Sequence, residues 1–519
     1  MTSALRNLLL IATLAACGAL GACGGTSSGP VVPPVDVTPA PGVSGPAWWS
    51  FGRNAQHTAE GAIATQDLNR IVWKTPIDLA PQFTGDELLA HYGSPVISDF
   101  NTVLLPVKTG SGGGFRVEAR SGVNGGLIWK ADTDYVMPSL NGGWLPSYNL
   151  ALTTTGSRLY APGAGGKLLV RDAVDSATGA LTPLAFYGTG NYTANTAAYD
   201  GTVFINTPLT VDSAGNVFFG FIVTGTNPSG LSSGIARVDA SGVGSWVSAS
   251  TIAGDAQIQK VATNSAPAVS NDLSTVYVAV NAPDAQNAAQ KGYLVALDST
   301  TLAVKSRVLL LDPATAAVAQ VPDNGTASPT VGPDGDVFFG VLESNNGAHH
   351  FRGWLLHFDS TLGQTLIPGG FGWDDTASVV PASMVASYTG SSSYLVMSKY
   401  NEYATGKNRI AVLDPKATEA DPISGKPIMN EVVTMLGATP EGTGVFEWCV
   451  NTAAIDPLTH SVLVNSEDGS LYRWDLSSNT LTQHIQLSGG LGEAYTPTAI
   501  GADGTVYAVN DSVLFALGK

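Results

Sequence analysis

Cysteine is scarce in this chain of 519 residues, which contains only Cys17, Cys23 and Cys449. No two cysteines are adjacent, no Cys-x-x-Cys-His sequence occurs, and the first two lie in an apolar segment at the N-terminus. The body of the protein therefore has a single cysteine. This excludes an internal disulfide, a covalently attached haem and a cysteine-rich metal site.

Charged residues, and basic residues above all, are also few. They make up 13 % of the chain, with 24 Lys and Arg against 41 Asp and Glu, so the formal net charge is -17. Nucleic-acid binding requires clustered Lys and Arg that neutralise phosphates, and this composition argues against it. It also argues against a basic membrane-surface helix. Apolar residues (44 %) and glycines (60) are plentiful, which predicts a globular, turn-rich protein.

Residues 1–23 have the pattern of an export signal. Arg6 precedes an apolar run from Leu8 to Ala22, which is too short to span a membrane. The run ends in Leu20-Gly21-Ala22-Cys23, which resembles a bacterial lipobox, and in that family the cysteine becomes the lipidated N-terminus. We expect lipidation at Cys23, with Cys17 and an ordinary cleavage site elsewhere as the alternatives.

The stretch that follows, residues 24–46, is rich in Gly, Ser, Pro and Val. Such a composition forms flexible to polyproline-like linkers, and it predicts a tether for the folded body. Gly24 directly after Cys23 resembles lipoproteins that are sorted to the outer membrane. These features predict a protein of the cell envelope whose lipid is its only contact with a membrane.

One phrase recurs along the body: an alternating apolar run that ends in Asp and is followed by a Ser, Thr or Gly turn. Six clear copies end at Asp172, Asp239, Asp298, Asp359, Asp414 and Asp475. Degenerate copies at residues 115–120 and 512–518 flank them, which makes eight. Each Asp carboxylate is expected to cap its turn by accepting backbone N–H groups, which is a structural role.

Each copy has a similar neighbourhood upstream. A short segment rich in Pro or small residues precedes a tight turn and an apolar-aromatic strand. An example is Pro333-Asp334-Gly335-Asp336 before Val337-Phe338-Phe339-Gly340. Asp-Gly between alternating runs is a strong hairpin signal. Each unit is therefore predicted to be a four-stranded antiparallel blade, and residues 47–519 a single all-β domain, an eight-bladed β-propeller.

The two ends of the repeat region complement each other. The last copy ends at Lys519 with no fourth strand, while residues 70–77 form an orphan strand that resembles the Trp-bearing strand at residues 125–130. We expect the N-terminal strand to complete the last blade and close the ring, because closure removes an exposed sheet edge.

These repeats, and the phrase Trp49-Ser50-Phe51-Gly52-Arg53-Asn54-Ala55-Gln56-His57-Thr58, resemble the pyrroloquinoline-quinone-binding-like repeat lipoproteins. That group includes the propeller lipoprotein of the outer-membrane assembly machine, and true quinoprotein alcohol dehydrogenases share its fold. The dehydrogenases clamp the quinone between a Trp and a vicinal Cys-Cys disulfide and hold calcium with Glu, Asn and Asp. This chain has no Cys-Cys, so we expect neither quinone nor calcium as a cofactor and no dehydrogenase activity.

In a propeller, the first strand of every blade lines the central channel, and the residues just before these strands gather at one mouth. Here they are polar or aromatic, and they include His91, Tyr92, Tyr148, Asn149, Asn206, Asn264, Glu447, Asn451, Glu493 and Tyr495. This ring is a candidate site for a small molecule or a peptide, or it holds water and packs the blades together. We favour water and packing, also for Glu447 and Asn451 beside Trp448-Cys449.

Three further features carry expectations. His349-His350 is expected to lie in a solvated loop, because adjacent side chains on a strand point to opposite faces and do not share a metal easily. Trp373-Asp374-Asp375 lacks the alternating Asp pattern of a calcium loop and is expected to form a turn. The insertions at residues 281–291, 344–352 and 415–430 are the places where partner contacts are expected.

The sequence thus predicts a non-catalytic envelope lipoprotein that presents a rigid propeller to other envelope proteins. The alternative, from a different class, is a small-molecule binder or a quinoprotein-type oxidoreductase that uses the channel mouth.

Overall fold

The computed structural model describes residues 45–84, 87–88, 92–111, 113–137, 148–282, 290–323, 325, 327–363, 365–490 and 495–519. Cys23, His91 and Glu493 therefore lie outside the described residues. Within the described part of the chain, no helix is long and apolar enough to cross a membrane.

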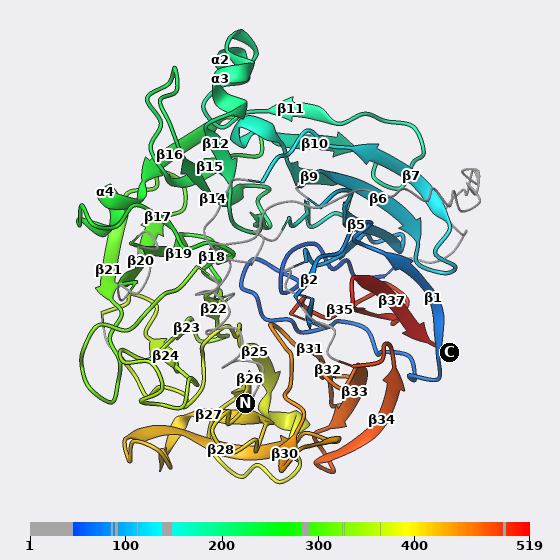
Figure 1. Ribbon diagram of the computed structural model, residues 1–519, viewed down its shortest axis with the longest axis vertical. Helices are drawn as coiled ribbons and strands as arrows, with labels where there is room; N and C mark the ends of the chain where they lie inside the picture. Colours follow the sequence, from blue (N-terminus) through cyan, green and yellow to red (C-terminus); the bar gives the residue numbers. More distant parts are fainter. Residues whose placement is uncertain are drawn as a thin grey trace, which may run out of the picture.

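Eight antiparallel sheets follow one another along the chain and form a ring, so the predicted eight-bladed propeller is confirmed (Figure 1). In each blade the short first strand lies near the axis and the last strand lies at the periphery.

Blade 1 comprises β4 (Val96–Ile97), β5 (Thr102–Lys108), β6 (Phe115–Ser121) and β7 (Leu127–Asp132). Blade 2 comprises β8 (Ala151–Leu152), β9 (Arg158–Pro162), β10 (Leu168–Asp172) and β11 (Thr182–Leu184). Blade 3 comprises β12 (Val203–Ile205), β13 (Thr210–Val211), β14 (Val217–Val223), β15 (Gly234–Val238) and β16 (Gly244–Ser248). Blade 4 comprises β17 (Lys260–Val261), β18 (Ala268–Val269), β19 (Thr275–Asn281), β20 (Gly292–Asp298) and β21 (Val304–Leu309).

Blade 5 comprises β22 (Thr330–Val331), β23 (Val337–Val341) and β24 (Trp354–Phe358). Blade 6 comprises β25 (Ser378–Pro381), β26 (Tyr394–Lys399), β27 (Arg409–Ala420) and β28 (Pro427–Leu436). Blade 7 comprises β31 (Ala454–Asp456), β32 (Ser461–Asn465), β33 (Ser470–Asp475) and β34 (Thr480–Gln486). Blade 8 comprises β35 (Ala499–Ile500), β36 (Val506–Asn510), β37 (Val513–Gly518) and β1 (Arg70–Pro76).

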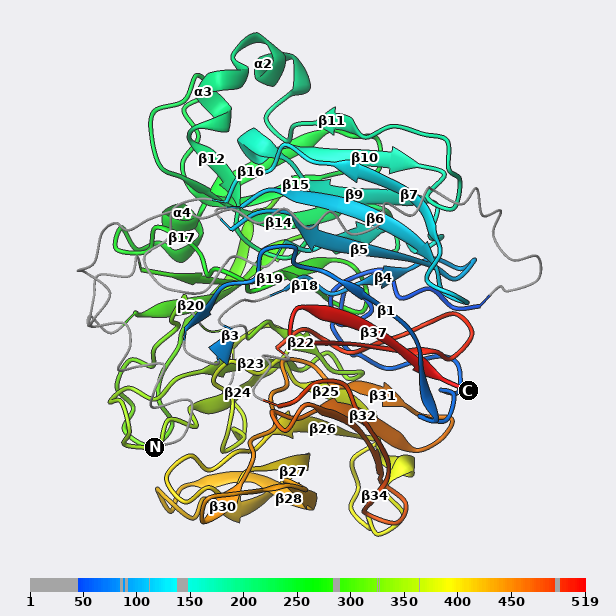
Figure 2. The ribbon, with the colours of Figure 1, turned by 45° about the vertical axis from the view of Figure 1, so that its right-hand side comes forward.

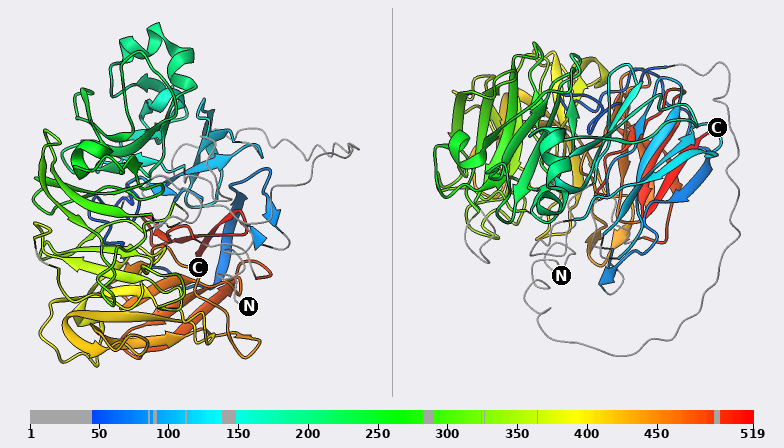
Figure 3. Two further views of the ribbon diagram at one scale, coloured as in Figure 1. Left: turned by 60° about the vertical axis from the view of Figure 1, so that its left-hand side comes forward. Right: turned by 90° about the horizontal axis from the view of Figure 1, so that it is seen from above.

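Short elements decorate the ring. Two small hairpins are formed by β2 (Phe83–Thr84) with β3 (Glu87–Leu88) and by β29 (Pro440–Glu441) with β30 (Gly444–Val445). The helices are α2 (Thr189–Ala194), α3 (Thr196–Asp200) and α4 (Ala249–Ala253), with 3-10 turns η1 (Ala164–Gly166) and η2 (Ala382–Met384). Figure 3 shows α2 and α3 projecting beyond the strands of the ring.

The burial pattern of a strand follows its place in the blade. All seven residues of β19 are buried, because the neighbouring blades cover both faces of the sheet. In the peripheral β34, exposed and half-buried residues alternate, because only one face meets a neighbour. The core is thus a set of apolar layers between adjacent sheets, and it accounts for the continuous apolar runs seen in the sequence.

The ring closes between the two ends of the chain, as predicted. Strand β1 pairs antiparallel with β37, with Arg70 opposite Gly518 and Pro76 opposite Val513. Trp73 of β1 donates its indole N–H to Gly122 O of blade 1 (2.8 Å) and packs against Tyr507, 5.7 Å between ring centroids. Figure 2 shows the blue β1 beside the red β37.

Blade 5 departs from the predicted four-stranded pattern, because its fourth strand is reduced to isolated bridges. Thr365 lies opposite Phe358, and Gly369 lies opposite Leu355. The physical reason is Pro368, which has no N–H to donate to a ladder, followed by the glycines at 369 and 370. All five residues of β24 are nevertheless buried, because residues 365–369 lie along it and bond to it.

Four of the six repeated Asp residues cap the turn after the third strand, as expected. Asp414 instead accepts the Lys416 N–H within the bulge of β27, and Asp172 pairs with Arg158 at 2.6 Å. Asp298 Oδ1 accepts the backbone N–H groups of Thr300 (3.1 Å) and Thr301 (2.9 Å). Asp239 Oδ1 accepts those of Ser241 and Val243, both at 2.9 Å. These carboxylates hold the turn between the third and fourth strands.

Candidate functional site

Residues 48–66 lie across one end of the axial channel. Trp48 pairs with Ile97 of blade 1, with N–H to O distances of 2.9 and 2.8 Å. Backbone carbonyl oxygens further along the segment accept N–H groups from other blades. The carbonyls of Trp49, Ala55, Gln56, Thr58 and Ala59 accept, in that order, the N–H groups of Leu152, Val269, Val331, Val379 and Ile455. Ser50 Oγ donates to Leu209 O of blade 3 (3.2 Å), and Gln66 N donates to Gly504 O of blade 8 (2.8 Å).

This segment, which we call the axial segment (residues 48–66), is thus hydrogen-bonded to all eight blades in chain order. Its partners lie in the first strands or directly beside them, towards the ends of those strands. Figure 1 shows the blue chain in the middle of the ring. The axial segment therefore covers the channel at the end opposite to the predicted mouth, and it ties the blades into one body.

His57 is the buried centre of the axial segment. Its side chain is fully buried, with Nδ1 2.7 Å from Pro329 O and Nε2 3.4 Å from Thr210 Oγ1. Burial lowers the pKa of His57 to about 4, against a smaller opposing effect of the Pro329 carbonyl. The imidazole is therefore neutral at pH 7 and acts as a brace between blades 3 and 5.

The opposite end, the predicted mouth, holds a cluster around Lys399 at the end of β26. Lys399 has no exposed surface, and its Nζ lies 2.7 Å from Asp374 Oδ1. The ammonium also lies over the rings of Tyr495 (5.0 Å) and Phe371 (5.4 Å). Burial lowers the pKa of Lys399, but Asp374 and other negative groups outweigh it, so the net shift is upward and the lysine is charged.

The neighbouring carboxyl, Asp375, is in a different state. Its Oδ2 accepts hydrogen bonds from Ser398 Oγ (2.7 Å) and from the Lys399 N–H (3.3 Å). Burial raises the pKa of Asp375 to about 8, with the attraction of Lys399 opposing it. One lysine is thus shared by two carboxyls, of which Asp374 forms the ion pair and Asp375 is predominantly protonated at neutral pH.

Glu447 belongs to the same cluster, together with Asn401, which follows β26. Asn401 Nδ2 lies 3.4 Å from Glu447 Oε2 and 3.2 Å from Trp448 O, and Asn401 Oδ1 accepts the Trp448 N–H (3.2 Å). The charges of Glu447 and Cys449 act on the pKa of Lys399. The structure therefore brings Glu447 and Tyr495, both predicted site residues, together with Lys399.

The other described site residues mainly join blades. Asn206 O accepts the Asn264 N–H (3.0 Å), and Asn206 Nδ2 donates to Val261 O (3.1 Å), which links blades 3 and 4. Asn451 O accepts the Thr376 N–H (2.9 Å) beside blade 6.

Hydrogen bonds of the same kind continue around the mouth. Asn149 Oδ1 accepts the Ser94 N–H (2.8 Å), and Thr496 Oγ1 donates to Tyr92 O (3.0 Å). Tyr148 is a core residue that stacks on Phe115 at 4.4 Å and donates its hydroxyl to Pro162 O (2.7 Å). The polar ring of the mouth is therefore largely used to hold neighbouring blades in register.

The mouth does not offer the donor set that a metal-bound quinone needs. Within the described residues, no group of three or more His, Cys, Asp and Glu side chains is placed to hold a metal ion. Asp374 and Asp375 are already engaged by Lys399 and Ser398. The residues present do not fit the group, and no reaction step is derived through it.

Sequence reasoning missed Lys399, Asp374 and Asp375. Trp373-Asp374-Asp375 does form the expected turn, but both carboxyl groups are buried in the cluster. The rule that places residues before a first strand at the mouth also applies to Asp374 and Asp375, which precede β25. A lysine at the end of the apolar strand β26 was the second available signal.

The expectation of a solvated loop is wrong for His349. Its ring is 2 % exposed, stacks on Trp354 at 3.8 Å and lies 3.2 Å from Asp421 Oδ2. His350 is half-buried and faces Glu402 at 3.9 Å, so the two imidazoles do point apart. The loop is held because Glu343 accepts backbone N–H groups from Gly347, His349, Phe351 and Gly353.

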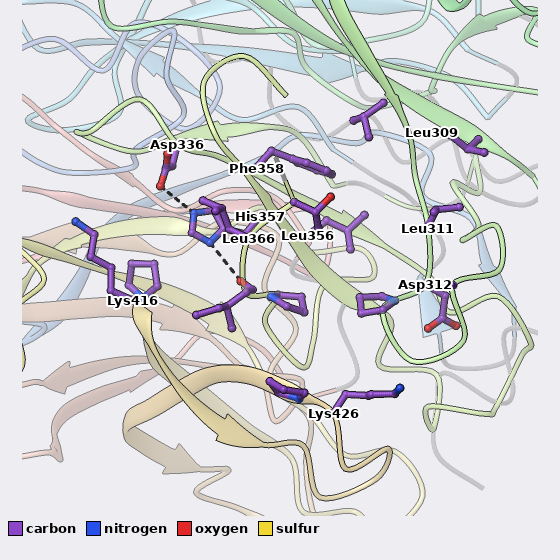
Figure 4. Close-up of a pocket in the computed structure, with 18 residues that line it drawn as sticks. Leu309, Leu311, Asp312, Asp336, Leu356, His357, Phe358, Leu366, Lys416 and Lys426 are labelled. Carbon is purple, nitrogen blue, oxygen red and sulfur yellow. Dashed lines mark hydrogen bonds and ion pairs between the residues drawn. The ribbon is translucent and has the colours of Figure 1, made fainter. Parts of the chain in front are cut away.

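A groove lies on the rim of the ring, where blade 5 lacks a full fourth strand. It has a volume of about 860 Å³ and lies between the end of β21, the strand β24 and the hairpin of β27 and β28. Leu309, Leu311, Leu356 and Phe358 line one part, and Lys416 and Lys426 of the hairpin line the other (Figure 4). We call this the rim groove. The predicted insertion at residues 415–430 forms one of its walls.

Comparison with known proteins supports the fold. No protein-family model matches the chain, and no curated protein matches it in sequence. The structure is similar to a europium-containing methanol dehydrogenase, with a TM-score of 0.51, 10 % identity and 89 % of both chains covered.

Two further solved structures are similar. For a quinohemoprotein alcohol dehydrogenase from Comamonas testosteroni, the TM-score is 0.51 at 13 % identity, with 91 % of this chain and 81 % of that chain covered. For BamB from Moraxella catarrhalis, the TM-score is 0.45 at 14 % identity, with 87 % of this chain and 99 % of that chain covered. The two dehydrogenase matches, with TM-scores of 0.51, indicate a shared fold, and identities this low do not carry activity across.

Proposed function

We propose that this chain is a non-catalytic, lipid-anchored propeller of the bacterial cell envelope that binds other envelope proteins on its rim. The observation that carries the proposal is where the open space lies. The rim groove, with a volume of about 860 Å³, is an open space on the periphery of the ring. The far end of the channel is covered by the axial segment.

Rigidity supports a role in presenting a fixed surface. The axial segment bonds to all eight blades, and β1 closes the ring on β37. Loops and hairpins held on such a frame keep their positions relative to one another, and this is how scaffolds present binding residues. A partner then loses little free energy to ordering the surface that it meets.

Anchoring belongs to the same proposal. Lipid attached to Cys23 and a tether over residues 24–46 would hold the propeller near the outer membrane, where its partners are envelope proteins.

The test is photo-cross-linking in intact envelopes. A photoreactive amino acid is introduced, one position at a time, at exposed rim residues outside the rim groove, such as Val243 (62 % exposed) or Leu436 (52 % exposed). The matched control carries it at the buried Val278. A discrete cross-linked partner of fixed stoichiometry from rim positions alone is the expected result. Absence of any protein cross-link from rim positions overturns the proposal.

A second candidate is a small-molecule site at the channel mouth. Lys399 and Asp375 favour it, because buried groups with shifted pKa values gather at functional sites, and Glu447 lies in the same cluster. In this alternative, Asn206, Asn264, Asn451 and Tyr495 contact the ligand.

The two candidates separate in a turnover assay. Purified chain is supplied with pyrroloquinoline quinone and calcium, and dye reduction is followed across alcohols and aldoses. We expect no cofactor-dependent turnover. Turnover that disappears in Glu447→Gln or Asn451→Ala, but not in a variant of the exposed Lys130, would move the function into the channel mouth.

A further inference from the structure

Lys399 and Asp374 differ from an ordinary buried ion pair. The Lys399 side chain has no exposed surface and the Asp374 side chain is 3 % exposed, so water is nearly excluded from both. Their charged atoms, Nζ and Oδ1, are 2.7 Å apart. The contact nevertheless lacks the angles of a hydrogen bond, and within the described residues Lys399 Nζ has no hydrogen-bond partner. The amine therefore lies against the carboxyl group in a contact that no hydrogen bond fixes.

A second buried pair shows how a hydrogen-bonded ion pair is built in the same protein. Lys108 Nζ donates to both oxygens of Asp78, at 3.3 and 3.1 Å, and to Ala80 O at 3.3 Å. Asp78 also accepts the Tyr92 hydroxyl and the Ala80 N–H. These bonds stabilise both charges, so we expect this pair to remain ionic. Lys399 lies closer to its carboxyl group and, among the described residues, has no such set of bonds.

The turn that carries Asp374 is held by close packing against blade 5. Gly353 allows the approach, since a Cβ atom there would lie 2.9 Å from Trp373 Cβ. Asp374 itself has a left-handed backbone conformation (φ 58°), which is uncommon for a residue with a side chain. Lys399 is held at the end of β26. Groups placed together by a rigid frame react as if each were present at a very high concentration.

A group that can donate and accept a proton lies in the same turn. Asp375 follows Asp374 directly, and the charges of Lys399 and Asp374 both act on it. Burial raises the pKa of Asp375 to about 8, so it is mainly protonated at neutral pH. Burial also raises the pKa of Asp374, against the opposing effects of Lys399 and of a hydrogen bond with the Tyr495 side chain. A neutral acid beside the contact can supply and recover the protons that amide formation requires, directly or through one water.

We propose that Lys399 and Asp374 condense to an intramolecular isopeptide bond, which links the end of β26 to the turn between blades 5 and 6. The ion pair is the state before this step. One proton passes from the ammonium to the Asp374 carboxylate, which leaves a neutral amine and a neutral acid. Nζ then forms a bond to Cγ of Asp374, and the bond from Cγ to the hydroxyl oxygen breaks.

The protons and electrons of the step balance. Asp375 gives its proton to the departing hydroxyl, which leaves as water, and it takes one proton from the nitrogen. One ammonium and one carboxylate thus become one amide and one water, and no atom changes its oxidation state. The reaction therefore needs no oxidant, reductant or other reactant.

The surroundings favour the product. A buried ion pair without good hydrogen bonds does not recover the cost of its desolvation, whereas an amide carries no charge. The rings of Tyr495 and Phe371, 5.0 and 5.4 Å from Nζ, help to exclude the water that would hydrolyse the bond. Since the body of the chain has a single cysteine, the isopeptide bond supplies a cross-link that a disulfide cannot. This inference concerns how the ring is held together, and it does not depend on the proposed function.

The test is peptide mapping of the purified full chain by mass spectrometry. Arg352, Lys399 and Lys407 are consecutive cleavage sites for trypsin. Trypsin does not cut after a lysine whose side chain has become an amide. We therefore expect residues 353–407 as one fragment, lighter than the sequence mass by one water molecule.

A second digestion shows whether the two side chains are joined. Chymotrypsin cuts after Tyr394, between the two residues in sequence, and it is expected to give a branched peptide in which Asp374 and Lys399 stay connected. The Lys108–Asp78 pair is the internal control. Residues 75–108 should appear at their unmodified mass, with the cut after Lys108 complete.

Three variants test the groups assigned. Asp374→Ala removes the carboxyl carbon that is attacked, and it should restore the cut after Lys399. Asp375→Asn keeps the size of the side chain but removes the acid, and it should lower the cross-linked fraction at least about tenfold shortly after synthesis. Asp132→Asn makes the same change at an exposed position and should leave the fraction unchanged. Circular dichroism reports whether each variant folds.

The proposal is overturned if the unaltered chain yields residues 353–399 at their unmodified mass and no joined fragment. It is also overturned if water is lost while Lys399 is still cut, because the loss then lies within the turn, as a cyclic imide at Asp374. If Asp375→Asn forms the bond as fast as the unaltered chain, the role given to Asp375 fails while the bond stands.

Discussion

At the scale of single residues, burial decides the charge at both ends of the axial channel. His57 is neutral because no charged partner accompanies it inside the axial segment. Lys399 is charged because Asp374 lies within 2.7 Å of its ammonium. The same desolvation thus gives opposite outcomes, and the difference is the presence of a counter-ion within contact distance.

His57 makes stability depend on pH in a predictable direction. Its folded pKa of about 4 lies below the unfolded value of 6.5, so the unfolded state binds the additional proton between these values. Stability is therefore fully present above about pH 6.5 and falls as the pH drops towards 4, by roughly 3 kcal/mol from this residue. Asp375 contributes the opposite slope over this range, because its folded pKa of about 8 lies above the unfolded value of 3.8. The contribution of His57 is therefore measured as a difference in urea unfolding midpoints, from pH 4.5 to 7.5, between the unaltered chain and a His57 variant.

The matched variants are His57→Gln, which removes the titrating ring, and His484→Gln at an exposed position. In the first variant, stability should fall more steeply with rising pH, because the opposing contribution of His57 is lost, and the second should follow the unaltered chain. A His57→Gln chain that keeps the full dependence would assign it to other groups.

The Lys399–Asp374 pair should show strong coupling. Lys399→Met leaves Asp374 buried without its counter-ion, and such a change costs about 3–5 kcal/mol. Adding Asp374→Asn removes the stranded charge, so the double variant should be more stable than Lys399→Met alone. The measurement is the urea unfolding midpoint at pH 7 for all four chains of the cycle. Additive losses would mean that the pair contributes no mutual stabilisation.

At the scale of elements, the two strands from the ends of the chain are the most consequential pairing. Strand β1 covers the edge of β37 and brings Trp73 against Tyr507, so one element both closes a sheet and joins blades 8 and 1. Blade 5 shows the converse. Where Pro368 reduces the fourth strand to isolated bridges, the rim groove lies beside it.

Deleting residues 70–77 should expose the edge of β37 and cause self-association, because an unpaired strand edge is a template for another chain. Size-exclusion chromatography with light scattering reports the association. Trp73→Ala keeps the backbone pairing and should lower stability by about 3–5 kcal/mol while the chain stays monomeric. The exposed Lys74→Ser is the matched control. A deletion variant that remains monomeric and folded would mean that β1 does not protect this edge.

At the scale of the whole molecule, the ring closes within the described residues, and the predicted anchor at Cys23 is expected to be independent of folding. The described ring begins at residue 45, where Gly45 N donates to Asp99 O (2.9 Å), and the predicted lipidation site at Cys23 precedes it. Everything that holds the blades together lies within residues 45–519.

Cys23→Ser is therefore expected to release the protein from membranes without changing its unfolding midpoint. Metabolic labelling with a palmitate analogue and membrane fractionation measure the first effect, and urea unfolding measures the second. Cys17→Ser is the matched control and should remain labelled. Label that persists in Cys23→Ser and disappears in Cys17→Ser would assign the lipid to Cys17.

The sequence by itself determined the class of fold, the number of blades and the way the ring closes. These follow from local patterns: turn residues between alternating runs, eight copies of one phrase, and an orphan strand matching a missing one. Each is encoded within a few tens of residues, so it can be read without knowing what packs against it.

Only the tertiary structure decided how the two ends of the channel are occupied and where the rim groove lies. Lys399 and Tyr495 are far apart in sequence, as are His57 and Pro329, and no local sequence pattern predicts that they are in contact. The axial segment was recognised as a motif, but its bonds to every blade depend on the closed ring. The rim groove depends on three blades at once, because a space between elements is a property of their arrangement and not of any one segment.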